Sequence, residues 1–199
     1  RAGDRPPEPR EWRRLGARPD WCPTTRKLPW PMVYNAHQRQ IAAPASDVGL
    51  LIDTLASKTD RLWPRGEWPA LRLDGPLGVG AAGGHGPVRY FVTAYAPGRR
   101  ARFQFTRHTG FNGHQAFAVE ALTANSTLLK HELTLAPSGM ARLSWPLFFR
   151  PLHDALIEES LDRAESACGT APAEAHRRSL WTKALRAPFA SRMKRAKPR

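Results

Sequence analysis

Four stretches of alternating residues, joined by very short turns, constrain the fold of this chain more than any other feature. The stretches are residues 88–95, 100–107, 113–123 and 127–135, and each is closed by a turn that contains Gly, Pro or Asn. Such short links join antiparallel neighbours, because parallel strands need a crossover of about a dozen residues or more. The sequence therefore predicts an antiparallel β-meander.

The alternation predicts that one face of this sheet is covered and that the other faces water. In the stretch 127–135, Leu129, His131 and Leu133 share one face. Lys130 and Glu132 lie on the other face, because successive side chains of a strand point in opposite directions. A second layer must therefore pack on the apolar face.

A helix is predicted at residues 45–57, ahead of the meander. The residues that recur at the spacing of one helical face are Val48, Leu51, Ile52 and Leu55. A strand at residues 32–41 and a short one at 71–74 bring the expected total to six strands. Residues 60–63 allow a short second helix, which Pro64 stops.

A long amphipathic helix after the meander is the expected cover of the apolar face. Its apolar stripe is Leu152, Leu156, Ile157, Leu161, Ala164 and Cys168, and its opposite, acidic side is Asp154, Glu158, Glu159, Asp162 and Glu165. The helix begins either at Pro151, or near Met140 with kinks at Pro146 and Pro151. We favour the kinked helix, because Leu143 and Leu147 continue the apolar stripe toward the N-terminus.

The net charge of +14 belongs mainly to the two ends of the chain. Residues 1–31 carry +4 and residues 169–199 carry +8, which leaves +2 on residues 32–168. We predict a basic, Pro/Arg-rich N-terminal extension, one domain over residues 32–168 and a basic C-terminal tail, with both ends solvated and disordered. The alternative is that the ends associate with nucleic acid or with an anionic membrane surface.

Other features of the sequence favour a cytoplasmic protein. No apolar run reaches the roughly 18–20 residues that cross a bilayer, and no leader with a charged start and an apolar centre is recognisable. The two cysteines, Cys22 and Cys168, match no metal or redox spacing, so we expect two free thiols. The sequence leaves the oligomeric state open.

Three short phrases are typical of one family: I-A-A-P-A-S-D-V at residues 41–48, G-H-Q-A-F at 113–117 and R-P-L-H-D-A-L at 150–156. With the order of the predicted elements, they resemble bacterial members of the START/Bet v 1-like superfamily, also called SRPBCC or polyketide cyclase-like. The resemblance implies an α+β helix-grip fold, in which a curved antiparallel sheet wraps around a long C-terminal helix and encloses a cavity for lipids, polyketides, sterols or other hydrophobic molecules. Two departures are the prolines near the start of the last helix and the count of six strands where seven are usual.

His131 is the first candidate for chemistry, because the alternation places it between Leu129 and Leu133 on the covered face. An imidazole there can hydrogen-bond a ligand or move a proton near neutral pH. The alternative is a core histidine with an ordinary hydrogen-bond partner, as most buried polar groups have. Asp74 and His85 are near enough in sequence to form an acid–base pair at the rim of the pocket.

Aromatic side chains and two histidines are expected to line the cavity. The candidate ligand-binding residues are Trp63, Trp68, His85, Tyr90, Phe103, Phe105, Phe117, His131, Trp145 and Phe149. Cavities that take small molecules are mostly apolar with a few polar groups. For any single residue the alternative is ordinary core packing. The Gly-rich residues 83–87 either rim the pocket or form only a turn.

The motifs of other enzyme classes are absent or are not followed by the secondary structure that they require. A G-x-G-x-x-G string at residues 78–83 precedes a turn and a strand rather than a helix, and no acid lies between Asp74 and Glu120, so it is not a dinucleotide site. There is no H-E-x-x-H, G-x-S-x-G or P-loop, and the seven histidines show no metal-ligand spacing. We expect neither a metal nor a cofactor.

The leading hypothesis is a module that binds a hydrophobic small molecule, lipid or polyketide-like, with His131 orienting it. The runner-up is a cyclase/aromatase- or dehydratase-like enzyme without metal, in which His131, helped by Tyr90 or Asp74, shuttles protons.

Overall fold

The computed structural model describes residues 32–106, 110–172 and 175–195. The predicted N-terminal extension and Cys22 lie outside the described residues. Met32–Arg199 forms one compact unit. No helix in the described ranges combines the length and the hydropathy that crossing a bilayer requires.

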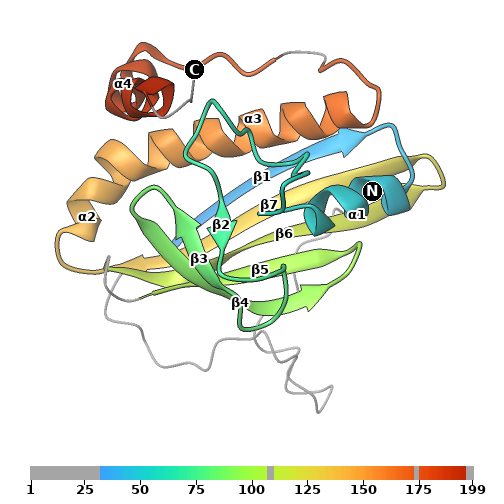
Figure 1. Cartoon of the computed structure of the whole chain (residues 1–199), viewed down its shortest axis with the longest axis horizontal. Helices are drawn as coiled ribbons and strands as arrows, with labels where there is room; N and C mark the ends of the chain where they lie inside the picture. The colour runs from blue at the N-terminus through green and yellow to red at the C-terminus, as the bar shows by residue number, and fades with distance from the viewer. Residues whose placement is uncertain (1–31, 107–109, 173–174, 196–199) are drawn as a thin grey trace, which may run out of the picture. The chain divides into compact units, whose positions relative to one another are not determined.

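A seven-stranded antiparallel sheet with the order β1-β7-β6-β5-β4-β3-β2 forms the body of this unit (Figure 1). The strands are β1 (Val33–Ile41), β2 (Arg72–Leu73), β3 (Ala82–His85), β4 (Val88–Ala96), β5 (Arg100–Phe105), β6 (Phe111–Thr123) and β7 (Ser126–Pro137). The predicted meander is confirmed as β4 to β7, and the first strand pairs with the last.

Strand β3 was not predicted from the sequence, so the expected total of six strands is wrong. Its sequence, Ala-Gly-Gly-His, has two glycines, which are depleted in strands, so the segment looked like a turn. The close pairing with β2 requires the glycine: a Cβ on Gly83 would lie 1.9 Å from the carbonyl oxygen of Arg72. Tertiary packing therefore overrides the low strand propensity at this edge of the sheet.

The first helix, α1 (Ala45–Asp53), begins where predicted and ends four residues early, although Leu55 stays buried in the core. The expected helix at residues 60–63 is wrong, because these residues form bends. The carboxylate Oδ1 of Asp60 accepts the backbone N–H groups of Leu62 and Trp63, at 3.0 and 2.9 Å. A short acidic side chain that binds its own following backbone in this way competes with helix formation.

The kinked form of the last helix is confirmed. The elements α2 (Ala141–Ser144), η2 (Trp145–Phe149) and α3 (Arg150–Ala167) follow one another without a break, and η2 is a π-helical turn in which the N–H of Arg150 donates to the carbonyl of Trp145. Pro151 has no N–H for the carbonyl of Leu147, four residues earlier. That carbonyl instead accepts the indole N–H of Trp181 at 2.9 Å.

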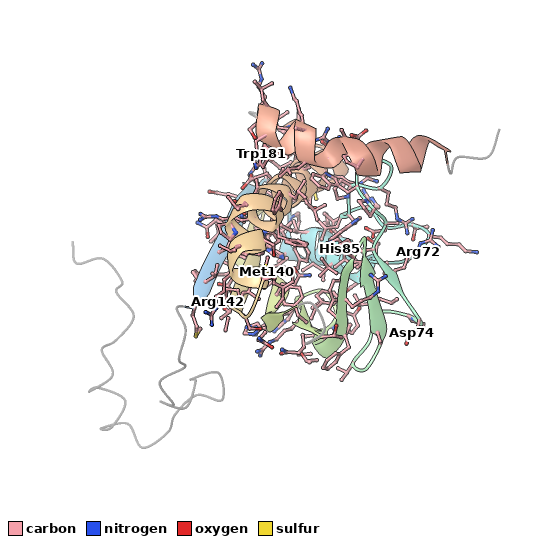
Figure 2. All side chains as sticks on the ribbon, turned by 90° about the vertical axis from the view of Figure 1, so that its left-hand side faces the viewer. Arg72, Asp74, His85, Met140, Arg142 and Trp181 are labelled. Carbon is pink, nitrogen blue, oxygen red and sulfur yellow. The ribbon has the colours of Figure 1, made fainter. Side chains whose placement is uncertain are left out.

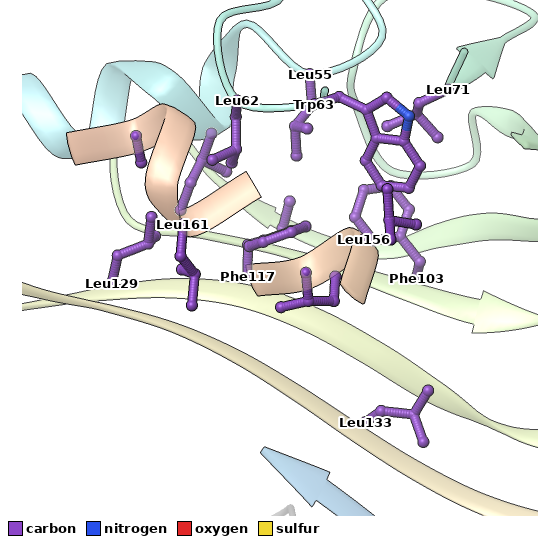
Figure 3. Packing of buried hydrophobic residues seen from close by; sticks show 14 of the residues in the cluster. Leu55, Leu62, Trp63, Leu71, Phe103, Phe117, Leu129, Leu133, Leu156 and Leu161 are labelled. Atoms are coloured by element: carbon purple, nitrogen blue, oxygen red, sulfur yellow. The ribbon is translucent and has the colours of Figure 1, made fainter. Parts of the chain in front are cut away.

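The core lies between the covered face of the sheet and the apolar sides of α1 and α3 (Figure 3). Phe103, Phe117 and Leu129 come from the sheet and meet Leu156 and Leu161 of α3. The covered and wet faces predicted from the alternation are therefore present, and the α+β helix-grip architecture is confirmed.

Four of the five acidic residues of α3 face β1 rather than open solvent, and the fifth, Glu159, contacts Trp68 and Arg178. Alternate residues of β1 point toward the helix, and Arg39 among them pairs with Glu158, Asp162 and Glu165. All four side chains are at least half-buried. Polar side chains of β1 and α3 therefore pair with one another beside the apolar core.

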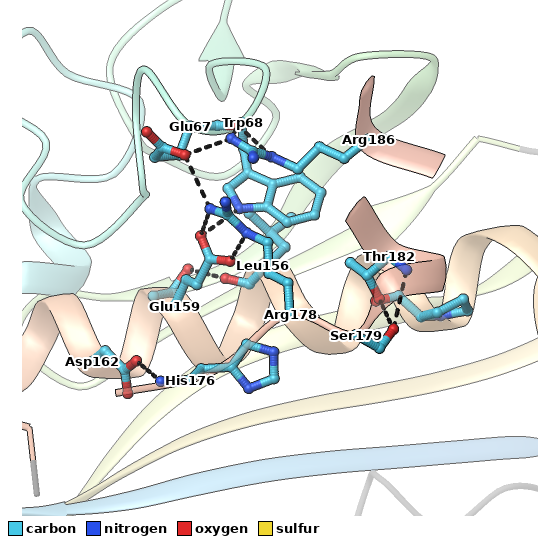
Figure 4. A network of polar contacts seen from close by, with 12 residues as sticks. Glu67, Trp68, Leu156, Glu159, Asp162, His176, Arg178, Ser179, Thr182 and Arg186 are labelled. Atoms are coloured by element: carbon cyan, nitrogen blue, oxygen red, sulfur yellow. Dashed lines mark hydrogen bonds and ion pairs between the residues drawn. The ribbon is translucent and has the colours of Figure 1, made fainter. Parts of the chain in front are cut away.

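The expectation of a disordered C-terminal tail is wrong for the described part of residues 169–199. Residues Leu180–Arg195 form a helix, α4, which packs against α3 and runs across it (Figures 1 and 4). Arg178, just before α4, pairs with Glu159 of α3 and with Glu67, and Arg186 also binds Glu67. Basic composition alone did not reveal these partners.

We expect Gly49→Ala to destabilise the protein by about 1–3 kcal/mol, because a Cβ there would lie 2.0 Å from the carbonyl oxygen of Gly98 and force α1 away from the β4–β5 turn. Gly75→Ala is the matched control, since no atom lies within 4 Å of its added Cβ. Urea unfolding of both variants measures the difference. Equal stability of the two would contradict the close approach of α1 to this turn.

Candidate functional site

A cavity of about 90 Å³ lies between the sheet and the C-terminal helices. Its walls are Trp68, Pro69, His85, Gly86, Pro87, Val88, Phe105, Phe111, Gln115, Leu133, Leu135, Trp145, Phe149, Leu152, His153 and Leu156. Apolar side chains dominate this set, and His85, Gln115 and His153 are its polar side chains. The loop before β4, β6, β7, η2 and α3 all contribute to it.

Half of the predicted ligand-binding residues line this cavity. They are Trp68, His85, Phe105, Trp145 and Phe149. The other five pack behind its walls: Trp63, Tyr90, Phe103, Phe117 and His131. These five residues are therefore packed in the core, as the alternative interpretation predicted.

Aromatic rings form a connected series along one wall. Phe111 meets Phe105, Trp145 and Phe149 edge to face, with ring centroids 6.4, 6.1 and 4.8 Å away. Edge-to-face pairs of this kind hold each ring in a fixed orientation. The wall is therefore rigid on the sheet side, where Phe105 and Phe111 belong to strands.

His85 reaches the cavity from β3, with Tyr90 and Trp63 behind it. Its Nδ1 lies 3.0 Å from the Tyr90 hydroxyl, and its ring lies 4.8 Å from that of Trp63. Burial, with a smaller contribution from the charge of His153 and Arg89, lowers the pKa of His85 to about 3. The ring is neutral near pH 7 and offers hydrogen bonds rather than charge.

The proposed Asp74–His85 pair is wrong. Asp74 is exposed, and its carboxylate accepts the backbone N–H of Ala82 at 2.9 Å. Figure 2 shows Asp74 at the outer edge of the sheet, apart from His85. Closeness in sequence did not bring the two groups together, because the register of β2 and β3 places Asp74 beside Ala82, at the opposite end of β3 from His85.

His131 is fully buried, with 0% of its surface exposed, as the alternation predicted. Its ring packs edge to face on Phe117 at 4.6 Å and lies 5.1 Å from the ring of His153. Within the described part of the chain, neither ring nitrogen has a hydrogen-bond partner. Burial, and then the nearby charge of His153 and His37, keeps the pKa of His131 well below its usual value. It is neither the partnered core histidine of the alternative nor part of the cavity wall.

Two polar wall residues were missed. Gln115 is 5% exposed, and its side-chain amide has no hydrogen-bond partner in the described ranges. The signal was present in the sequence, because Gln115 alternates with Phe117 on the covered face of β6. His153 lies on α3 between the apolar stripe and the acidic side, where helical periodicity does not decide the direction of a side chain.

A cluster of titratable groups adjoins the cavity at His153. Asp154 lies 3.3 Å from Nε2 of His37 and 3.4 Å from Nδ1 of His153, and Nδ1 of His37 lies 2.6 Å from Glu158. Burial opposes the charged forms, but the hydrogen bonds and charges of the partners outweigh it: they raise the pKa of His37 and hold that of Asp154 well below its usual value. Local spacing could not reveal this cluster, because β1 and α3 are far apart in sequence.

Solved structures share this architecture. No family model and no curated protein matches the sequence. A solution structure from Thermobifida fusca superposes with a TM-score of 0.55 at 17% identity, over 72% of this chain and 99% of that one. Norcoclaurine synthase from Thalictrum flavum, solved with dopamine and hydroxybenzaldehyde, gives 0.51 at 17% identity, over 69% and 86%.

The chain has a helix-grip fold, which these solved structures share. A conserved protein of unknown function from Enterococcus faecalis also shares this fold, with a TM-score of 0.51 at 16% identity over 84% of this chain and 88% of that one. At these identities the likeness concerns the helix-grip fold alone. The seventh strand that the fold requires is β3, the strand that the sequence analysis missed.

We expect the protein to lose stability in mild acid, partly through His85. His85 takes up a proton near pH 6.5 in the unfolded chain, but only near pH 3 in the folded chain, because its pKa there is lowered to about 3. The stability that neutral His85 contributes is therefore complete above pH 6.5 and is lost as the pH falls below that value. From pH 7 to 5 this share amounts to about 2 kcal/mol. His85→Gln should lack it in urea unfolding at the two pH values. An unchanged pH dependence in that variant would contradict the buried, neutral histidine.

Proposed function

We propose that this protein binds a hydrophobic small molecule in the cavity between the sheet and the C-terminal helices. The observation that carries the proposal is an enclosed wall of aromatic and aliphatic side chains with three polar side chains, His85, Gln115 and His153, set into it. Apolar burial supplies affinity in such a site, and the few polar groups orient the ligand. Lipids and polyketide-like molecules have the matching chemistry.

The volume of the cavity limits how such a ligand enters. About 150 Å³ holds a benzene ring in an apolar cavity, whereas this cavity measures about 90 Å³. A larger ligand must therefore extend out of the cavity, which is partly open to solvent, or move one wall outward. The wall suited to this movement is η2, because its π-helical turn interrupts the regular hydrogen bonding of the long helix and because it carries Trp145 and Phe149.

The unpartnered amide of Gln115 favours a ligand with one polar group. A ligand carbonyl or hydroxyl in the cavity could hydrogen-bond this amide, and such a bond contributes about 1 kcal/mol. Norcoclaurine synthase, with the same fold, was solved with two aromatic molecules that carry hydroxyl groups. These points support an apolar ligand with a hydroxyl, carbonyl or similar group at one end.

We expect the fluorescent apolar probe anilinonaphthalene sulfonate to bind in a 1:1 complex, and Leu152→Trp to weaken this binding at least tenfold by filling the cavity. Leu50→Trp is the matched control, because Leu50 is an exposed residue of α1 outside the cavity. Fluorescence titration measures both affinities. Native mass spectrometry of the protein from its own host, followed by denaturing extraction, then identifies the natural ligand. Equal weakening in both variants, or no saturable binding, would refute the cavity as the site.

A second candidate function is a cyclase/aromatase- or dehydratase-like enzyme. The histidines that meet the cavity favour it, but their properties limit it. His131 does not reach the cavity wall, and a pKa of about 3 makes His85 a weak base at neutral pH. Proton transfer would therefore depend on His153, so the role first given to His131 passes to its neighbour.

Replacement of His153 by Gln separates the two functions once the natural ligand is known. A binding protein should lose about tenfold or less in affinity, because one hydrogen bond is worth about 1 kcal/mol. An enzyme should keep its ligand and lose turnover by about 100-fold or more, because general acid–base catalysis contributes that much. Parallel titration and product analysis by mass spectrometry measure the two quantities. His131→Gln serves as the comparison, since it is buried beside His153 but outside the wall.

Association with nucleic acid or an anionic membrane surface rests on charge alone. Of the basic residues around α4, Arg178 and Arg186 already pair with Glu67 or Glu159, and both lie over the ring of Trp68. Phosphate groups would have to compete with these contacts. The partners of these arginines therefore favour a structural role for the start of α4.

A further inference from the structure

Three histidines from three elements meet beneath the first turns of α3. His37 of β1 and His131 of β7 are directly paired in the register of the sheet, so their side chains lie on the same face. His153 of α3 approaches from above, with its ring centroid 6.0 Å from that of His37 and 5.1 Å from that of His131. Asp154, the next residue of α3, extends a carboxylate into the same place.

Two of the three pairs of donor atoms have the separation of neighbouring ligands in a tetrahedral metal site. Oδ1 of Asp154 lies 3.3 Å from Nε2 of His37 and 3.4 Å from Nδ1 of His153. In a tetrahedral site with bonds of about 2.0–2.1 Å, neighbouring ligand atoms stand about 3.3 Å apart. Ligand atoms of all three residues lie within 4.8 Å of one another.

Other groups hold these donors in place. Glu158 lies 2.6 Å from Nδ1 of His37, and it would hold the ring proton on Nδ1 when an ion occupies Nε2. Asn35 donates to Oδ1 of Asp154 at 3.0 Å. A carboxylate behind the second nitrogen of a histidine ligand is the usual outer support of metal sites.

A second, independent observation also points to a missing partner here. Six buried side-chain nitrogen or oxygen atoms in the described residues lack a hydrogen bond, and four of them belong to this cluster: Oδ1 of Asn35, both ring nitrogens of His131 and Nε2 of His153. Buried polar atoms without partners are rare in folded proteins and call for an explanation. The water bound to an ion at His37, His153 and Asp154 would supply a partner for one of these atoms.

We propose that His37, His153 and Asp154 bind a divalent transition-metal ion of the zinc class, with Glu158 as the outer support of His37. Two imidazoles and one carboxylate suit zinc, copper, nickel or iron rather than magnesium or calcium, which prefer oxygen ligands. The three protein ligands leave a fourth position for water. Because His153 also belongs to the cavity wall, the ion would lie next to the ligand cavity. The residues that point to this ion do so whether or not the cavity binds a hydrophobic molecule.

The competing explanation is a plain ion-pair cluster. Protonated His37 placed between Asp154 and Glu158 satisfies the same atoms without a metal. The two explanations differ in one measurable respect: the metal site takes up one equivalent of cation at neutral pH, and the ion-pair cluster takes up none.

Titration of the full, untagged chain with Co²⁺ tests the proposal, with visible absorption as the readout and Zn²⁺ as the competitor. A histidine tag must be absent, because it would bind the same ions. We expect one equivalent to bind with a Kd in the micromolar range or tighter, with the intense visible bands of a tetrahedral site, and Zn²⁺ to displace it.

Four variants locate the site. His37→Gln, His153→Gln and Asp154→Asn should each weaken Co²⁺ binding at least 100-fold, and Glu158→Gln about tenfold, as loss of an outer support does. His114→Gln is the matched control, because His114 is a half-buried histidine of β6 outside the cluster, and it should bind as the wild type does. Circular dichroism verifies that each variant is folded.

No saturable uptake by the wild type would overturn the proposal and leave the ion-pair cluster as the explanation. Uptake that His114→Gln weakens as much as His37→Gln would overturn it as well, because it would show binding to surface histidines in general. If His153→Gln does not fold, Co²⁺ binding by His37→Gln tests the proposal instead. His37 lies on β1 at the edge of the sheet, where a substitution disturbs folding less. Binding of anilinonaphthalene sulfonate by these variants shows separately whether the cavity is intact.

Discussion

The rest of the structure depends on the way α3 lies across the sheet. Its apolar side, with Leu156 and Leu161, closes the core, while its acidic side pairs with Arg39 and His37 of β1. The first contact supplies most of the stability, because apolar burial contributes about 1.5–3 kcal/mol for each large side chain. The second contact depends on the orientation of the helix, because half-buried charged groups are stable only beside their partners. Together they determine both the position and the rotation of the helix.

The cavity exists because the helix is irregular at its beginning. The prolines at positions 146 and 151 are incompatible with an uninterrupted α-helix, and the π-helical turn between them displaces Trp145 and Phe149 from the regular stripe. These rings form one wall against Phe111 instead of packing flush on the sheet. The same irregularity frees the carbonyl of Leu147, which binds Trp181 of α4. One local constraint of the sequence therefore shapes the pocket and also anchors the terminal helix.

The surroundings of each histidine determine its pKa and therefore its charge near neutral pH. Each of His85, His131 and His153 has its pKa lowered by burial, whereas His37, beside two carboxylates, has its pKa raised. The neutral rings suit hydrogen bonding to an uncharged ligand or coordination of an ion, because both need a free lone pair. The cavity and the histidine cluster share His153, so binding at one of them can affect binding at the other.

Local patterns in the sequence determined the elements and the faces of this protein. The turns set the antiparallel meander, the alternation of β7 buried His131, and the apolar stripe identified α3 as the cover, because each signal needs only neighbouring residues. Tertiary structure decided the rest. Gly83 became a strand residue through contact with β2, Phe103 and Phe117 went into the core rather than the cavity, and His37 came to lie beside Asp154. These outcomes depend on which distant segments touch, and contacts between distant segments leave no periodic trace in a single sequence.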